Sequence, residues 1–384
     1  MTVASKKVFD SKGFKRIIIV AGEASGDLHG SNLVRAMNSI HPGLSFAGVG
    51  GNRLREAGVD LIAHCSEMGV VGLTEVGSKL RHILGVLFQL KAIIRESKPD
   101  LVILVDYPDF NIPLAKSAFR AGVPVFYYIS PQVWAWRKSR IRTLKKIVRK
   151  MAAILPFEPA VYAEYGMAAE FVGHPLLDII DENIPAAPRE NDSCRIGLLP
   201  GSREGEIRTI LPVILESAEI LSRQISKRTS FFLPLAETID KKIVDELLAK
   251  CPLEIEIVRE GIYSRIKGAD AAMVASGTAT LETALLGTPM VVLYRVSPLT
   301  YFAGKHLINV KCVSLVNIIA GRVIVPELLQ DDMNPQRIAS EMLSIIEDPD
   351  RAAQIRAGLK EVRTKLGQPG ASERAARIAC GLLG

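Results

Sequence analysis

Short, continuously apolar runs recur along the whole chain, and segments with helical periodicity separate most of them. Runs of this kind are typical of parallel strands that are buried on both faces. In the first half they lie at 16–21, 46–49, 101–105, 125–129 and 152–155. In the second half they lie at 196–199, 230–235, 254–258, 271–275 and 290–294. This alternation predicts an α/β fold built from doubly wound parallel sheets.

The length of 384 residues predicts two domains, each with its own core. Residues 176–193 are rich in Pro, Asp, Glu and Asn, which is typical of a linker. We therefore expect an N-terminal domain at 1–180 and a C-terminal domain at 181–384. The last helices of the chain could pack back on the N-terminal domain.

Composition narrows the classes of function. The net charge of +7 suits a partner that carries phosphates: a nucleic acid, an anionic lipid or a phosphorylated metabolite. The five cysteines are scattered without a Cys-x-x-Cys pair, so we expect reduced thiols in the cytoplasm and no structural zinc. Residues 1–16 lack the apolar core of a signal peptide, and no apolar run is long enough to span a bilayer.

Two loops of the second half have a strand–loop–helix pattern. After the strand at 196–199, Pro200 and Gly201 end the strand, and Ser202 and Arg203 precede a helix expected from Thr209. Pro212 is then expected in the first helical turn. The second loop is SGTATLE (276–282). One such loop is an ordinary turn, but two in one domain favour an anion site made of free backbone N–H groups, hydroxyls and a guanidinium.

The first half offers a carboxylate at a strand end. Asp106 follows the apolar run 101–105, and in open α/β sheets ligands bind beyond the carboxyl ends of strands. We expect Asp106 to be a general base and Asp109 only to cap the next helix. The loop at 22–27 is Gly-x-x-x-Gly rather than a dinucleotide fingerprint, and Asp27 is a candidate N-cap for the helix behind it.

Two further segments mix apolar and basic residues. Residues 68–90 are consistent with a core helix or with a surface whose apolar side chains enter lipid. Residues 134–150 hold both tryptophans and a basic helix, which could be a packed loop with a solvated face, a membrane contact or a nucleic-acid site. No recognised nucleic-acid-binding module accompanies them.

Taken together in this order, several motifs give the chain a close resemblance to the lipid-A-disaccharide synthase family of inverting glycosyltransferases. They are AGEASGD (21–27), DYPDFN (106–111), SPQVWAWR (130–137), LPFE (155–158), FVGH (171–174), LLPGSR (198–203), ASGTA (275–279) with Glu282, PMVV (289–292) and PELLQ (326–330). The chain has Leu315-Val316-Asn317 where the family usually has Leu-Pro-Asn. Residues 1–15 resemble an extension without an assigned role.

The resemblance implies the GT-B fold, in which two Rossmann-like domains face each other across a cleft. It implies transfer from UDP-2,3-diacylglucosamine to 2,3-diacylglucosamine 1-phosphate, which yields lipid A disaccharide 1-phosphate and UDP without a metal or cofactor. Asp106 and Arg203 would be catalytic. The remaining residues would bind UDP and the donor (Ser202, Ser276, Gly277, Thr278, Ala279, Glu282 and Asn317) or line the acceptor side (Glu23, Ser25 and Gly26).

Because both substrates carry acyl chains, the resemblance also implies a peripheral protein on the inner face of the cytoplasmic membrane. We expect the membrane contact to include six apolar side chains: Val70, Val71, Leu73, Leu84, Leu87 and Phe88. A homodimer is possible, and nucleic acid is not an expected partner. The alternatives are another UDP-N-acetylglucosamine-using enzyme of the same fold, either a peptidoglycan glycosyltransferase or an epimerase, and a non-catalytic nucleotide- or RNA-binding protein.

Overall fold

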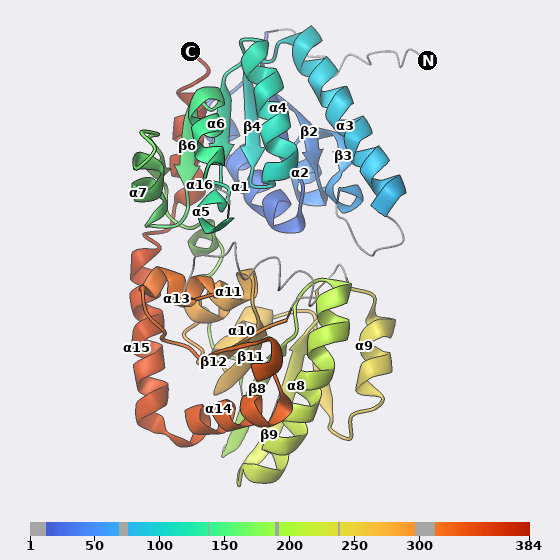
Figure 1. Cartoon of the computed structure of the whole chain (residues 1–384), viewed down its shortest axis with the longest axis vertical. Coiled ribbons are helices and arrows are strands. Elements are labelled where there is room, and N and C mark those ends of the chain that lie inside the picture. The colour runs from blue at the N-terminus through green and yellow to red at the C-terminus, as the bar shows by residue number, and fades with distance from the viewer. Residues whose placement is uncertain (1–12, 69–75, 137, 189–191, 237–238, 296–311) are drawn as a thin grey trace. The chain divides into compact units, whose positions relative to one another are not determined.

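The computed structural model describes residues 13–68, 76–136, 138–188, 192–236, 239–295 and 312–384 (Figure 1). The chain divides into two compact units. The first consists of Met1–Asp178 together with Leu366–Gly384, and the second is Ile179–Lys365. Each contains one parallel sheet covered by helices, which confirms the predicted α/β class.

The first unit contains a seven-stranded sheet in the order β3-β2-β1-β4-β5-β6-β7. All of its neighbouring strands are parallel. The strand order changes direction between β1 and β4, which are hydrogen-bonded neighbours. The strands are β1 (Lys15–Ala21), β2 (Leu44–Gly50), β3 (Val59–His64), β4 (Leu101–Val105), β5 (Val125–Tyr128), β6 (Lys150–Ala153) and β7 (Glu170–Phe171).

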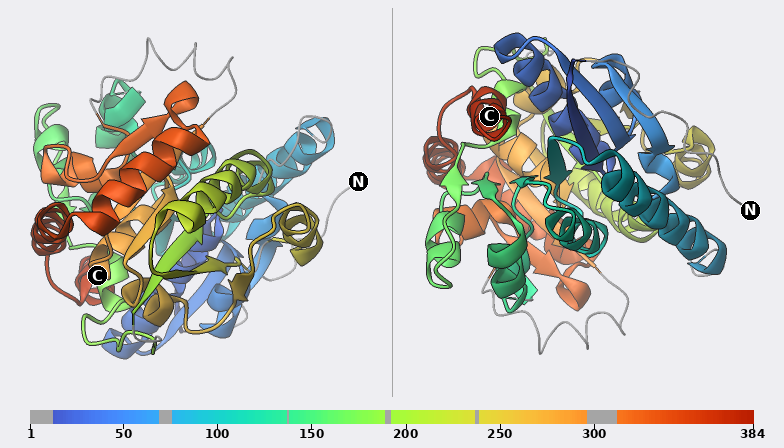
Figure 2. Two further views of the ribbon diagram at one scale, coloured as in Figure 1. Left: turned by 90° about the horizontal axis from the view of Figure 1, so that it is seen from below. Right: turned by 90° about the horizontal axis from the view of Figure 1, so that it is seen from above.

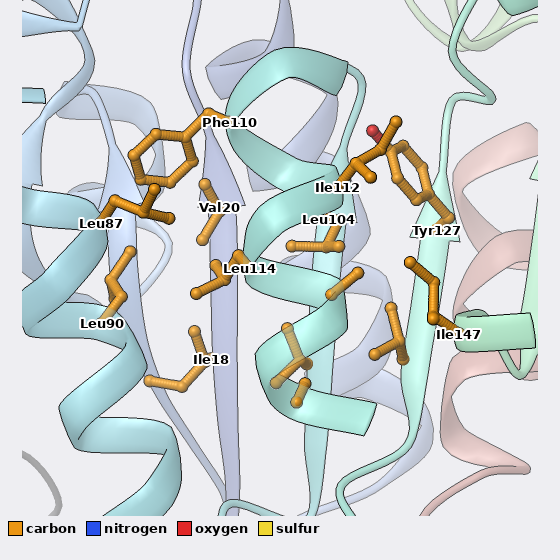
Figure 3. Close-up of a cluster of buried hydrophobic side chains, with 14 of the residues drawn as sticks. Ile18, Val20, Leu87, Leu90, Leu104, Phe110, Ile112, Leu114, Tyr127 and Ile147 are labelled. Carbon is orange, nitrogen blue, oxygen red and sulfur yellow. The ribbon is translucent and has the colours of Figure 1, made fainter. Parts of the chain in front are cut away.

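Alternate side chains of β1 enter different cores on the two faces of this sheet. Ile18 and Val20 pack with α3 (Val76–Ser97), α4 (Pro108–Arg120), α6 (Arg140–Ile147) and α7 (Glu158–Ala163) (Figure 3). Ile17 and Ile19 pack with α1 (Ala24–Ile40), α2 (Asn52–Glu56) and α16 (Ala371–Cys380). The two helical layers of this unit are visible in the right view of Figure 2.

Helix α16 lies at the end of the chain but belongs to the first unit. The carboxylate of Asp178 holds its start by accepting hydrogen bonds from the backbone N–H groups of Gly370, Ala371 and Ser372. Asp178 ends the short 3-10 helix η2 (Pro175–Asp178). The unit also contains η1 (Cys65–Glu67) and α5 (Val133–Trp136).

The second unit contains a six-stranded parallel sheet in the order β10-β9-β8-β11-β12-β13. Its strands are β8 (Ser193–Leu199), β9 (Arg228–Pro234), β10 (Ile255–Val258), β11 (Ala271–Ala275), β12 (Met290–Tyr294) and β13 (Glu327–Leu329). Its helices are α8 (Glu204–Gln224), α9 (Lys241–Leu248), α10 (Ile262–Lys267), α11 (Thr278–Leu285), α13 (Leu315–Ala320), α14 (Pro335–Glu347) and α15 (Pro349–Lys365), with η3 (Gln330–Asp332). Strand β13 is too short for its apolar pattern to have predicted it.

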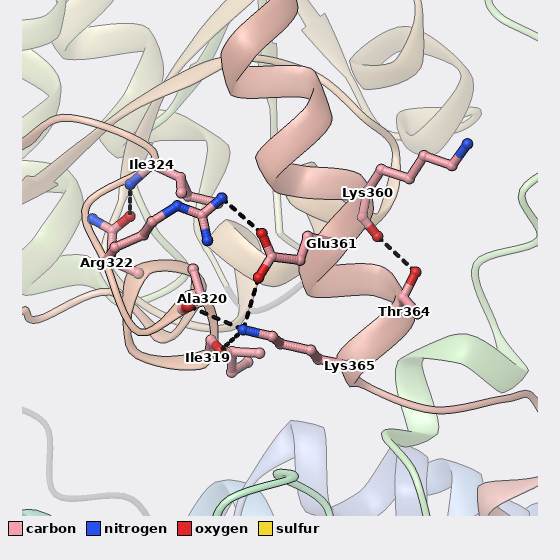
Figure 4. A network of polar contacts seen from close by, with 9 residues as sticks. Ile319, Ala320, Arg322, Ile324, Lys360, Glu361, Thr364 and Lys365 are labelled. Carbon is pink, nitrogen blue, oxygen red and sulfur yellow. Dashed lines mark hydrogen bonds and ion pairs between the residues drawn. The ribbon is translucent and has the colours of Figure 1, made fainter.

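Ionic and polar contacts connect the end of α13 to α15 (Figure 4). The ammonium of Lys365 donates to the carbonyls of Ala320 and Ile319, which belong to the last turn of α13. Glu361 lies 2.8 Å from Lys365 and 2.7 Å from Arg322. A cation is favourable at a helix C-terminus because it meets the negative end of the helix dipole.

Three local expectations are wrong. Asp109 does not cap α4, because the N-cap is Tyr107 and Asp109 lies inside the first turn. Helix α8 begins at Glu204 rather than Thr209, so Pro212 lies inside the helix and not in its first turn. Helix α1 begins at Ala24 with Glu23 as its N-cap. The buried carboxylate of Asp27 instead accepts hydrogen bonds from the backbone of residues 51, 53 and 54, at the start of α2. No helix in the described ranges is long and apolar enough to cross a membrane.

Candidate active site

The first part of the site lies where the strand order of the first unit changes direction. Ala21 pairs with Val105, so Gly22 and Asp106 leave the carboxyl ends of β1 and β4 at neighbouring positions. In open α/β sheets this point is where ligands bind, because the loops on either side diverge. The topology therefore brings together two segments that the sequence singled out separately.

The backbone of Asp106 is held in an unusual conformation. Asp106 and Tyr107 both have φ of 45°, in the left-handed region that residues other than glycine rarely adopt. Three contacts fix it: the Asp106 carbonyl accepts from Asn111 Nδ2 at 2.7 Å and from the Tyr127 hydroxyl at 2.6 Å, and the Asp106 N–H donates to the Tyr128 carbonyl. Strain of this kind costs about 1–3 kcal/mol per residue and persists where the surroundings enforce it.

The environment of Asp106 raises the pKa of its carboxyl to about 6, first through burial and then through the negative charge of Glu23. A carboxylate with this pKa is ionised at neutral pH but is a stronger base than an ordinary aspartate. Asp106 therefore remains the candidate for a general base, and its raised pKa suits that role.

Tyr107 connects the two loops. A Cβ atom on Gly22 would lie 2.4 Å from Cδ1 of Tyr107, so the ring requires glycine at position 22. The Tyr107 hydroxyl donates to the carbonyl of Met68 at 2.9 Å. Glu23 and Ser25 are exposed at the start of α1, whereas Gly26 is buried against Ala21.

A second buried carboxyl supports the segment after β5. Glu158 accepts hydrogen bonds from Trp134 Nε1 at 3.1 Å and from the backbone of Leu155 at 3.1 Å. Burial raises the pKa of Glu158 to about 7. From the sequence alone, no role was expected for Glu158, Asn111 or Tyr127. Glu158 belongs to the LPFE motif and Asn111 to the DYPDFN motif, whereas Tyr127 belongs to no motif.

The second unit has the same topology at β8 and β11. These strands are neighbours at the change of direction, with Leu199 paired to Val274. The loops at 200–203 and 276–277 therefore leave adjacent strand ends, and α8 and α11 begin immediately after them. Two helix N-termini beside each other form a favourable position for an anion. Ser202, Arg203, Gly277 and Thr278 are exposed there, and Ser276 and Ala279 are partly buried.

The backbone N–H groups of the first loop are not free as expected. Glu206 Oε2 accepts from the N–H groups of Ser202 and Arg203, at 3.1 and 3.3 Å. Glu206 Oε1 accepts from the Arg203 guanidinium at 3.2 Å. This is a capping box, in which a side chain of the first turn satisfies the loop. A bound phosphate would therefore compete with the carboxylate of Glu206.

Glu282 and Asn317 differ in their surroundings. Glu282 is partly buried beside the Tyr263 hydroxyl, and burial raises the pKa of its carboxyl. Asn317 is fully buried, and its amide accepts from the N–H groups of Ile324 and Val325 and donates to the Val325 carbonyl and to Glu327. These four bonds use the hydrogen-bonding capacity of the amide, so we assign to Asn317 the support of this segment rather than contact with a nucleotide.

The expected membrane residues fall into three groups. Val70, Val71 and Leu73 lie outside the described residues. Leu84 and Phe88 are 42% and 65% exposed on α3. The expectation for Leu87 is wrong, because its side chain is buried in the core beneath α3, where it cannot meet lipid (Figure 3). Within the described residues, no group of His, Cys, Asp and Glu side chains could hold a metal ion.

Comparison with known proteins decides the family. A sequence model described as lipid-A-disaccharide synthetase matches residues 17–380. The chain belongs to the lipid-A-disaccharide synthase family. A lipid-A-disaccharide synthase of Syntrophus aciditrophicus is 52% identical over 96% of this chain and 98% of its own length. One from Geobacter sulfurreducens is 47% identical over 96% of this chain and 97% of its own length.

This lipid-A-disaccharide synthase family member also resembles solved structures at low sequence identity. A glycosyltransferase of kitacinnamycin has a TM-score of 0.64 at 16% identity, covering 97% of this chain and all of the other. The calicheamicin glycosyltransferase CalG4 has a TM-score of 0.62 at 15% identity, with 96% and 98% covered. These likenesses establish the GT-B fold. The chain is a glycosyltransferase of lipid A biosynthesis.

Proposed function

We propose that the protein transfers a diacylated glucosamine from UDP-2,3-diacylglucosamine to 2,3-diacylglucosamine 1-phosphate. The products are the β-linked disaccharide 1-phosphate and UDP. The observation that carries this proposal is Asp106: a carboxylate with a raised pKa, held by a strained backbone at the sheet's change of direction. A glycosyl transfer with inversion needs one such base on the acceptor side.

In this mechanism the carboxylate of Asp106 takes the proton from the acceptor's primary hydroxyl. That oxygen attacks the anomeric carbon of the donor, and the bond from the anomeric carbon to the UDP oxygen breaks with its electron pair on UDP. Ser202, Arg203 and the start of α8 stabilise the charge that develops on the leaving diphosphate. Residues 276–279 and Glu282 hold the phosphate and the ribose.

The test is UDP release by the purified protein in detergent, with and without the acceptor and in the presence of EDTA. Acceptor-dependent release that persists in EDTA is expected. Asp106→Ala should lower turnover by about 10²–10⁴-fold, because a positioned base contributes this much. Activity on a UDP-sugar without acyl chains, but none on the acylated donor, would assign the fold to another UDP-sugar reaction. A near-normal rate in folded Asp106→Ala would remove the proposed base.

We further propose that α3 contacts the membrane that supplies both substrates. Leu80, Leu84 and Phe88 are all exposed and recur at every fourth position, so they form one stripe along the helix. Lys91 lies over the Phe88 ring at 5.6 Å, and Arg81 is exposed next to the stripe. Apolar side chains flanked by cations suit the boundary between acyl chains and anionic headgroups.

A further inference from the structure

An ion pair between α4 and α6 has no role in the mechanism above. Arg140 is the first residue of α6, and its Nη2 donates to Oδ1 of Asp109 at 2.6 Å. Asp109 lies in the first turn of α4. The side chain of Arg140 is 26% exposed and that of Asp109 is 77% exposed. The arginine is thus held against the protein, while its partner carboxylate faces water.

The pair lies close to the proposed base. Asp109 follows Asp106 by three positions and lies in the first turn of α4, and the Asp106 carbonyl accepts a hydrogen bond from Asn111 of the same helix at 2.7 Å. Tyr127 is a second connection between Arg140 and the base. Its hydroxyl donates to the Asp106 carbonyl at 2.6 Å. Burial and Asp106 raise the pKa of Tyr127, and the positive charge of Arg140 is among the influences that lower it. Arg140 therefore lies near the group that holds the backbone of Asp106, and Tyr127 stays protonated at neutral pH with or without that positive charge.

The guanidinium has capacity for a further anion. Among the described residues its single hydrogen bond is to Asp109, whereas a guanidinium has five N–H donors arranged as a fork. The N-terminus of α6 places partial positive charge at the same point. The carboxylate of Asp109 is mostly exposed, so water screens the ion pair and Asp109 holds the arginine weakly. A phosphate monoester carries more charge than a carboxylate and accepts from a guanidinium in bidentate geometry.

We propose that Arg140 binds the phosphate of the acceptor, and that Asp109 orients the guanidinium while the acceptor is absent. The inference rests on the proposed function, since it assigns a subsite to that function's acceptor. The ligand is a phosphate monoester on a lipid-linked sugar. Arg140 would select acceptors that carry this phosphate over those with a free hydroxyl at the same carbon.

The test compares two substitutions that break the same ion pair. Activity is measured as acceptor-dependent UDP release in neutral detergent, with 2,3-diacylglucosamine 1-phosphate and with 2,3-diacylglucosamine as acceptors. Arg140→Gln should lower kcat/KM for the phosphorylated acceptor by about ten- to a hundredfold, because it removes a charge-assisted contact. It should leave kcat/KM for the unphosphorylated acceptor nearly unchanged. Asp109→Asn should preserve or increase kcat/KM for the phosphorylated acceptor, because Arg140 is then no longer partly neutralised.

Arg142→Gln is the matched control, because Arg142 is an exposed arginine of the same helix. It should leave the ratio of the two kcat/KM values unchanged. If Arg140→Gln and Asp109→Asn lower activity alike on both acceptors, the ion pair is only structural and the inference is wrong. It is also wrong if Arg140→Gln weakens binding to anionic vesicles but leaves that ratio unchanged, since the arginine would then meet membrane headgroups. Absence of acceptor-dependent UDP release in the unmodified protein would overturn the proposed function and this inference with it.

Discussion

At the scale of single residues, the raised pKa of Asp106 predicts how activity depends on pH. The base works only as a carboxylate, and burial together with Glu23 raises its pKa to about 6. We expect kcat/KM to fall about tenfold for each pH unit below this value, where an ordinary aspartate would remain ionised. A pH profile of kcat/KM with saturating donor measures this. A flat profile from about pH 5 to pH 8 would contradict it.

The raised pKa of Asp106 also predicts that its ionised carboxylate lowers the free energy of unfolding. A carboxyl whose pKa is higher in the folded than in the unfolded state binds its proton more tightly when folded, so ionisation favours unfolding. Asp106→Asn removes this effect and should raise the free energy of unfolding near pH 8 by about 1–3 kcal/mol, while activity is lost. The gain should be smaller at about pH 5, because the folded carboxyl is then already protonated in the unmodified protein. Urea unfolding at about pH 8 and about pH 5 tests this, and a destabilised variant at pH 8 would contradict it.

Some residues of the candidate site could be predicted from the sequence, and others could not. The position of Asp106 at a strand end follows from the apolar run before it, so the candidate base could be named without a structure. The hydrogen bonds of Asn317 and the burial of Leu87 could not be predicted in the same way. The partners that occupy the Asn317 amide lie at 324–327, beyond a turn, and the burial of Leu87 depends on which side of α3 meets the sheet. Both are decided by packing rather than by local pattern.

At the scale of elements, the start of α8 predicts a competition for UDP. Glu206 occupies the N–H groups of Ser202 and Arg203 that a phosphate would otherwise use. Glu206→Gln keeps an acceptor oxygen but removes the negative charge, so we expect the Kd for UDP to fall several-fold. Glu204→Gln is the control, because Glu204 lies in the same turn but pairs with Arg208. Calorimetric titration with UDP measures the Kd of both variants. If Glu206→Gln alone binds UDP more weakly than the unmodified protein, the carboxylate orients the loop for the nucleotide and the predicted competition is wrong.

The exposed stripe of α3 predicts that one aromatic side chain contributes to membrane binding. Phe88→Ser should reduce cosedimentation with vesicles that contain anionic lipid, because it removes a large apolar side chain from the stripe. Phe119→Ser is the control, since Phe119 is 56% exposed on α4, outside the stripe. Equal binding of Phe88→Ser and the unmodified protein would exclude α3 as the contact.

At the scale of the whole molecule, the α/β class and the two loops that follow β8 and β11 could be predicted from sequence, but the strand order could not. The apolar runs identify the strands because buried parallel strands are continuously apolar. They do not say that β1 lies next to β4, or β8 next to β11, which is what brings Gly22 to Asp106 and Ser276 to Ser202. Neighbours in a sheet are chosen by crossover connections and by the packing of distant helices.

Two buried histidines, His29 and His174, predict how the protein unfolds in acid. His174 lies near Asp178 and Leu366, where the chain leaves the first unit and returns to it. Burial lowers the pKa of His29 to about 4, with Asp178 opposing and Arg53 adding to the effect, and burial next to His29 lowers that of His174 to about 3. Both groups therefore bind protons more readily when unfolded. Their contribution to stability is present above about pH 6.5 and is lost as pH falls toward 4, on the order of several kcal/mol in all. The N–H of His174 donates to the carbonyl of Leu366, and Asp178 holds the start of α16, so this loss acts where α16 joins the unit.

We therefore expect the first unit to open before the second as pH falls from 7 to about 4. Hydrogen exchange should show earlier loss of protection in α1, α16 and β1 than in α8 and β8. His29→Gln removes one of the two titrations and should make the stability of the first unit less dependent on pH, whereas the second unit should be unaffected. Simultaneous opening of both units, or an unchanged pH dependence in His29→Gln, would show that the histidines do not govern acid unfolding.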